Sequence, residues 1–148
     1  MDALTRTLKE TIEAADRAIT AEDFDELMKF YADDASLVVK PGLTVSGKES
    51  IRRAFVAIAD HFNNSIVVTQ GEIQVIQGGD VALVIMETLL QATDKAGVKT
   101  EISRRATYVF RQISEKWLCV VDNSYGTTLL DSVVGSQDIK RVVPTSCK

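Results

Sequence analysis

The chain has few of the residues that build disulfide frameworks or metal sites. Its 148 residues include two cysteines and one histidine. Cys119 lies in an apolar, strand-like run and Cys147 is next to last, unlike the dense cysteine framework of a small secreted domain. One histidine, His61, does not supply the two or three imidazoles of common zinc sites. We therefore expect no metal, no cofactor and a location in a reducing cytoplasm.

Long apolar runs and an excess of basic residues are also missing. No run of about 18 apolar residues occurs, and no basic region followed by an apolar block opens the sequence, so neither membrane insertion nor export is expected. The 21 Asp and Glu residues outnumber the 17 Lys and Arg residues, which gives a formal net charge of -4. Because phosphate backbones repel such a chain, nucleic acid is not an expected partner. The composition, 45% hydrophobic and 26% charged, is that of one globular domain.

Apolar residues recur at helical spacing in the first part of the chain. They predict an amphipathic helix over residues 3–19 and a second helix that Thr20 caps, with an apolar stripe that ends at Tyr31. The segment Ser46-Gly47-Lys48-Glu49 has the pattern of a capping box and predicts the start of a third helix. Between these helices, Asp33-Asp34 is expected to bond free amides where helix turns into strand.

From residue 65 onward the pattern changes to strands rich in valine, isoleucine and threonine. A short strand over residues 35–39 precedes them, and the four main strands are predicted over residues 65–77, 81–93, 100–113 and 116–125. Short turns predict a consecutive antiparallel meander, and Gly71 indicates a bulge that bends the sheet. Because the second main strand is nearly all apolar, both faces of the sheet are expected to be covered. Helices would cover the concave face, and a second subunit the convex face, in a homodimer.

Three motifs occur in this order of elements. They are Phe30-Tyr31-Ala32-Asp33-Asp34-Ala35, Gly47-Lys48-Glu49-Ser50-Ile51 and the run from Trp117 to Gly126. Together they resemble the nuclear transport factor 2-like superfamily, in its SnoaL-like and ketosteroid-isomerase-like branch, over about residues 3–126. The resemblance implies an α+β cystatin-like fold, in which a cone-shaped, curved antiparallel sheet packs on three N-terminal helices and encloses an apolar pocket. We expect a single domain over residues 1–126 and a tail, 127–148, whose first half packs and whose end is flexible.

The isomerase chemistry of that branch is not expected here. In ketosteroid isomerases the aspartate that moves the proton lies after the Ala-Asp-Asp-Ala-like segment and directly before a proline. Here that place holds Val39-Lys40-Pro41. A second isomerase aspartate, a hydrogen-bond donor, matches Tyr108, whose hydroxyl could still donate. Because a donor without a base does not move the proton, we expect no steroid isomerase activity.

Strand alternation groups the candidate site residues by face. One set on the last strand comprises Trp117, Cys119, Val121 and Asn123, and the resemblance implies that the tryptophan face looks inward. The matching inward set on the preceding strand comprises Arg104, Ala106, Tyr108 and Phe110. Polar groups for a small apolar or mixed-polarity ligand would then come from Tyr108, Asn123 and Arg104, beside Trp117, Phe55 and Tyr31. Alternatively these are core residues, and Arg104 pairs with Glu87 or Glu101.

Glu87 is the only carboxylate inside the long apolar strand. Facing inward it would be a candidate general acid or base; facing outward it would pair with Arg104 or Arg105 at the dimer face. Asp122 has the opposite parity to Asn123 and is expected to face outward. Two functions stay open. One is a small-molecule pocket, with isomerase-, cyclase- or dehydratase-type chemistry that uses Glu87, Tyr108 and Asn123. The other is a non-catalytic dimerisation, assembly or ligand-carrier module.

Overall fold

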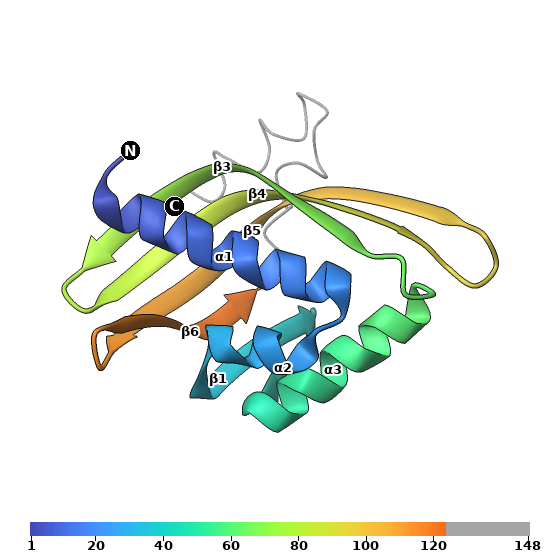
Figure 1. Ribbon diagram of the computed structural model, residues 1–148, viewed down its shortest axis with the longest axis horizontal. Helices are drawn as coiled ribbons and strands as arrows, with labels where there is room; N and C mark the ends of the chain where they lie inside the picture. The colour runs from blue at the N-terminus through green and yellow to red at the C-terminus, as the bar shows by residue number, and fades with distance from the viewer. Residues whose placement is uncertain (124–148) are drawn as a thin grey trace, which may run out of the picture.

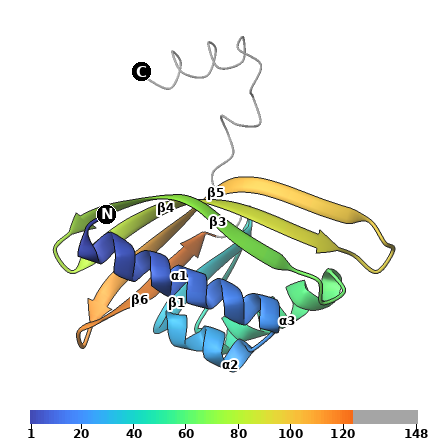
Figure 2. The same cartoon turned by 45° about the horizontal axis from the view of Figure 1, so that its top comes forward.

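The structure is a computed structural model that describes residues 1–123, and it confirms the α+β fold predicted from the sequence (Figure 1). The elements in chain order are α1 (Ala3–Ala21), α2 (Phe24–Leu27), η1 (Met28–Phe30), β1 (Tyr31–Lys40), β2 (Leu43–Ser46), α3 (Lys48–His61), β3 (Val67–Gly78), β4 (Val81–Thr93), β5 (Lys99–Ile113) and β6 (Lys116–Asn123). Six strands form one curved sheet, and all three α-helices lie on the same face of it (Figure 2). The predicted tail, residues 127–148, lies outside the described residues.

The first helix forms as predicted, but the second is much shorter. The Asp2 side chain caps α1 by accepting a hydrogen bond from the Thr5 amide at 2.7 Å. Asp23, not Thr20, caps α2, because its carboxylate accepts from the Glu26 amide at 3.2 Å. After one helical turn the chain tightens into η1, and Tyr31 begins a strand instead of ending a helical stripe. The periodicity was misleading here, since a buried strand and a buried helical face use the same apolar residues.

The strand after this helical segment is longer than predicted. Asp33 and Asp34 lie within β1 as exposed side chains, so the prediction that they bond free amides at a turn is wrong. They pair instead with Lys48 at 3.5 Å and Arg111 at 3.6 Å. After the turn at Pro41-Gly42 the chain returns as β2, a strand that the sequence analysis missed.

The predicted capping box does not form. Ser46 is the last residue of β2, and its hydroxyl lies 2.9 Å from the Ser36 hydroxyl of the paired strand. Gly47 occupies the N-cap of α3 with φ of 86°, a conformation that favours glycine, and no side chain caps the helix. Ser46, which the motif predicted as the cap of a helix, therefore pairs within the sheet instead.

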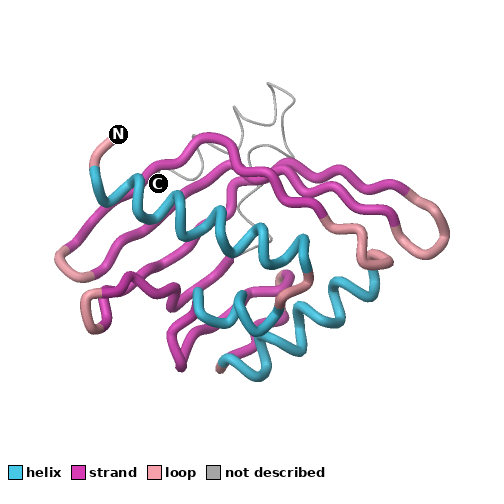
Figure 3. The backbone as a smooth tube through the Cα atoms, viewed as in Figure 1, coloured by secondary structure: helices cyan, strands magenta, loops and turns pink. Residues whose placement is uncertain are grey.

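The long strands form the predicted antiparallel meander. The sheet order is β2-β1-β6-β5-β4-β3, and β1 runs parallel to β6. Figure 3 shows the helices packed along one side of these strands. The predicted bulge at Gly71 is present, because the register of β3 against β4 shifts between Gln70 and Ile73. The helices thus pack into the concave side of a bent sheet, where most of the core lies.

The opposite face of the sheet carries apolar side chains in register. Ile76, Leu83, Val109 and Val121 are successive partners across β3, β4, β5 and β6, and we call these four residues the outer row. Two of them are clearly exposed, Ile76 at 50% and Val121 at 37%.

In the described part of the chain, no helix is long and apolar enough to span a membrane.

Candidate functional site

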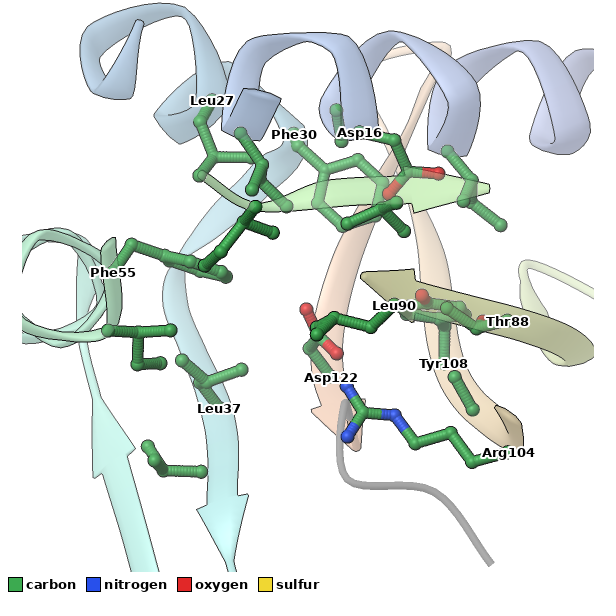
Figure 4. A pocket seen from close by; sticks show the side chains of 18 of the residues that line it. Asp16, Leu27, Phe30, Leu37, Phe55, Thr88, Leu90, Arg104, Tyr108 and Asp122 are labelled. Carbon is green, nitrogen blue, oxygen red and sulfur yellow. The ribbon is translucent and has the colours of Figure 1, made fainter. Parts of the chain in front are cut away.

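A cavity of about 200 Å³ lies between the concave sheet face and the helices (Figure 4). Its walls are mostly aliphatic and aromatic side chains from α1, α3, β1, β4 and β5, among them Ile12, Leu37, Phe55, Leu90 and Ala106. In another protein an apolar cavity of about 150 Å³ accepts a benzene ring. The size therefore fits a molecule with one ring and a few substituents.

Six polar side chains interrupt this apolar lining. They are Asp16 from α1, Tyr31 at the start of β1, Thr88 from β4, Arg104 and Tyr108 from β5, and Asp122 from β6. Figure 4 shows the Asp16 carboxyl pointing down from the helix and the Arg104 guanidinium directed toward Asp122. A few polar groups in an apolar cavity are typical of small-molecule sites.

Burial strongly perturbs the carboxyl of Asp16. Its side chain is buried, with 8% exposed, and burial raises the pKa of its carboxyl to about 7. The Gln70 amide opposes this rise by donating from Nε2 to Asp16 Oδ2 at 2.6 Å, whereas the nearby charges of Asp122 and Glu13 add to it. A carboxyl with this pKa can give or take a proton near neutral pH.

Asp122 and Tyr31 form a buried pair on the opposite side of the cavity. The Tyr31 hydroxyl donates to Asp122 Oδ2 at 2.6 Å, and Asp122 is only 3% exposed. Burial, with the charge of Asp122, raises the pKa of the Tyr31 hydroxyl well above its usual range. The phenol consequently stays protonated and serves as a fixed donor to the carboxylate.

Two side chains of β5 complete the polar set. Burial lowers the pKa of the Arg104 guanidinium from its usual value, and its Nε is a buried donor that bonds to none of the described residues. Burial also raises the pKa of the Tyr108 hydroxyl well above its ordinary range, so this group remains a neutral donor. Arg104 and Tyr108 both line a cavity in which most of the other side chains are apolar and cannot accept hydrogen bonds.

The structure distributes the sequence-predicted site residues over both faces of the sheet. Those that line the cavity are Tyr31, Phe55, Arg104 and Tyr108. Trp117 packs against the core near the end of the sheet and is not among the residues that line the cavity. Glu87 is exposed on the outer face opposite Arg105, so it is not an acid or base of this cavity. Asn123 also faces outward, where its Nδ2 donates to the Thr107 hydroxyl at 3.1 Å.

A bulge in β6 explains why the parity prediction failed for Asn123 and Asp122. Val109 pairs with Val121, but the next residue, Phe110, pairs with Cys119, so Val120 is an extra residue in the strand. Cys119 faces inward as predicted, whereas beyond the bulge the faces exchange. The carboxyl of Asp122 therefore enters the cavity, and Asn123 leaves it. Asp16 was also missed, although it interrupts the apolar stripe between Ile12 and Ile19.

The geometry does not support an isomerase-type aspartate, a cysteine nucleophile or a metal site in the described residues. Val39 lines the cavity while Lys40 is exposed, so no carboxyl stands where ketosteroid isomerases carry the proton-moving aspartate. Burial raises the pKa of the Cys119 thiol, which keeps it a poor nucleophile. Within residues 1–123, no group of three or more His, Cys, Asp or Glu side chains could hold a metal ion.

Solved structures with the same architecture come from proteins of different descriptions. Aln2 from a Streptomyces species superposes with a TM-score of 0.74 at 13% identity, over 83% of this chain and 90% of that one. A candidate dehydratase of the NTF2-like family from Streptomyces avermitilis gives a TM-score of 0.69 at 20% identity, over 80% and 92%. The association domain of C. elegans CaMKII gives 0.65 at 20% identity, over 82% and 94%. At such identities the likeness concerns the fold.

The sequence itself supplies the family. No curated protein sequence matches the chain. The profile of the SnoaL-like domain, however, matches residues 8–121, which include all six strands except the last two residues of β6. The chain therefore belongs to the SnoaL-like domain family.

Proposed function

We propose that the protein binds a ring-sized, largely apolar molecule in the cavity and transfers a proton on it, with Asp16 as the acid or base. The observation that carries the proposal is a buried carboxyl of pKa about 7 in the wall of a mostly apolar cavity. Tyr108 and Arg104 would hold an oxygen of the ligand by hydrogen bonds from the facing strand. Isomerisation, cyclisation and dehydration are reactions of this proton-transfer class, and one relative by fold is described as a candidate dehydratase.

Proton transfer can be tested without the natural substrate, using 4-methylcyclohexanone in D2O as the probe. We expect the protein to accelerate exchange of the hydrogens next to the carbonyl, measured by NMR. Asp16→Asn should lower the exchange rate by about 100-fold, because it removes the general base. Asp80→Asn, a change of an exposed acid in the β3–β4 turn, is the control and should leave the rate unchanged.

The place of binding is tested by two tryptophan variants on adjacent residues of β4. Leu90 lines the cavity, whereas Leu89 points to the other face of the sheet. Leu90→Trp should fill the cavity and abolish both probe binding and exchange, while Leu89→Trp should preserve them. Exchange that survives in Leu90→Trp would contradict the proposal.

We also propose that the protein is a homodimer through the outer sheet face. The outer row presents apolar side chains in register on four strands, and contiguous apolar patches of this kind usually mark an interface. A second copy of the chain is the proposed occupant, since two-fold homodimers are the commonest assembly and one relative by fold is an association domain.

A further inference from the structure

The Asp16 carboxyl is held by a short chain of hydrogen bonds that crosses three elements. Thr88 on β4 donates from its hydroxyl to Gln70 Oε1 at 2.9 Å, and Gln70 on β3 donates from Nε2 to Asp16 Oδ2 at 2.6 Å. Gln70 and Thr88 are direct partners in the β3–β4 register. Thr88 is 5% exposed, so this series of hydrogen bonds begins in the core and ends at Asp16 in the cavity wall.

The direction of this chain matters because a glutamine amide has two different ends. Its oxygen only accepts and its nitrogen only donates. In the structure the Thr88 hydroxyl donates to the oxygen, and the nitrogen end faces Asp16. An N–H donor favours the ionised form of a carboxyl, which opposes the effect of burial. In this orientation the amide stabilises the ionised form of Asp16.

The bulge at Gly71 places Gln70 on the inner face. Before the bulge Val68 lines the cavity and Gln70 contacts Asp16; after it, Ile73 and Val75 pack against the core. The two inward pairs are therefore separated by two residues instead of one, and Glu72 points outward as an exposed side chain. If β3 kept a regular alternation through Gly71 and Glu72, Glu72 would share the face of Gln70 and add a carboxyl close to Asp16.

We propose that Gln70, oriented by Thr88, is the positioning residue for Asp16. It holds Oδ2 in place, directs Oδ1 to the ligand, and stabilises the ionised carboxylate that takes the proton. This role rests on the proposed function of Asp16, but the effect on the carboxyl itself is independent of any ligand. The other charged or titratable groups that act on Asp16 are Glu13 and Arg17 of α1, Asp122 of β6 and Tyr108 of β5, and none of them is altered in the variants below.

The test is a titration of the Asp16 carboxyl by carbon-13 NMR in the full chain. Gln70→Leu should raise the Asp16 pKa by about one unit or more, because a donor to the ionised form is lost while the site stays filled. Leucine is preferred to alanine, since a smaller residue would widen the surface groove between α1 and β3 that Asp16 and Gln70 both line. Gln74→Leu, at an exposed glutamine of the same strand, is the control and should leave the Asp16 pKa unchanged.

Two variants of the second residue separate positioning from simple packing. Thr88→Val removes the hydroxyl at nearly constant volume and should also raise the Asp16 pKa, because the amide can then turn its oxygen to a protonated carboxyl. Thr88→Ser keeps the hydroxyl and should restore the wild-type value. An Asp16 pKa that does not move in Gln70→Leu, or moves equally in Thr88→Val and Thr88→Ser, would overturn the inference.

The same measurements distinguish this inference from the proposed function. If the pKa shifts occur but the wild type exchanges no hydrogens of 4-methylcyclohexanone, Gln70 still positions Asp16 and only the proposed chemistry is wrong. If exchange occurs and the pKa values do not move, the chemistry stands and Gln70 has no positioning role.

Discussion

Asp16 is a single side chain whose burial makes the stability of the whole fold depend on pH. Its carboxyl has a pKa of 3.8 in an open chain and about 7 in the folded protein. Between these values the unfolded chain has released the proton that the folded protein keeps. The free energy of unfolding must then fall as pH rises from about 4 to about 7, by on the order of 4 kcal/mol in total, and this contribution stays constant outside that window.

Replacing this carboxyl by an amide should remove that pH dependence. In Asp16→Asn the side-chain oxygen can still accept from Gln70, but the residue no longer ionises. We expect the free energy of unfolding of the variant to depend less on pH between 4 and 7 than that of the wild type. At pH 8 the variant should be the more stable of the two. Urea unfolding of both proteins across this range measures the difference, in which the titrations of all other groups largely cancel. A difference that does not vary with pH would contradict the burial of an ionisable Asp16.

Among the single residues of the cavity, the sequence predicted the inward orientation of Arg104 and Tyr108 but not that of the two acids, Asp16 and Asp122. Arg104 and Tyr108 lie on the cavity side of β5 because that strand has no irregularity between them, so simple alternation holds. Asp16 carried a weak signal, as a charged residue inside an apolar helical stripe, but amphipathic helices often tolerate one such residue. Asp122 carried none, because its orientation depends on the extra residue Val120 upstream. A bulge has no reliable sequence signature without a glycine.

Gly71 shows how one residue determines the geometry of an element. A Cβ at this position would lie 3.2 Å from Glu87 Cβ and 3.7 Å from the Glu87 carbonyl oxygen, on the neighbouring strand. Gly71→Ala should therefore lower the free energy of unfolding by about 1 kcal/mol, because the two strands must separate slightly. Thermal or urea unfolding measures the loss.

Gly78, the last residue of the same strand, supplies the control. A Cβ there would meet no atom within 4 Å. Gly78→Ala should leave stability unchanged or raise it by about 0.4 to 1 kcal/mol, since alanine restricts the unfolded chain. Equal effects of the two substitutions would show that close approach at the Gly71 bulge is unimportant.

At the element scale the long, β-branched segments were predictable and the junctions were not. The boundaries of β4 match the prediction, and those of β5 differ by one residue at its start, because alternation and turns agree along the whole length of these segments. In contrast, Ser46 fits a capping box and a strand end equally well, and only pairing with Ser36 decides between them. Where a residue can pair with a strand that is distant in the sequence, this pairing overrides its local preference for a helix or a cap.

The whole molecule has two differently used faces of one sheet. The concave face packs on α1, α2 and α3 and leaves the cavity, whereas the convex face carries the outer row. Curvature links the two, because the same bend that opens a cavity on one side makes the other side convex and accessible. An assembly through the outer row would leave the cavity of each copy intact, so binding and association should be separable by mutation.

The outer row gives the test of association. Leu83→Glu places a charge in the middle of the row and should raise the dimer dissociation constant by about 100-fold or more, because a buried unpaired carboxylate is costly. Val98→Glu makes the same change at an apolar residue of the β4–β5 turn that is 57% exposed, and should leave the dimer intact. Sedimentation velocity over a concentration series measures both. Hydrogen exchange on 4-methylcyclohexanone should persist in the Leu83→Glu monomer, since no cavity residue is changed. A wild-type chain that sediments as a monomer at every concentration would refute the homodimer, and loss of exchange with dissociation would mean that the cavity depends on the second subunit.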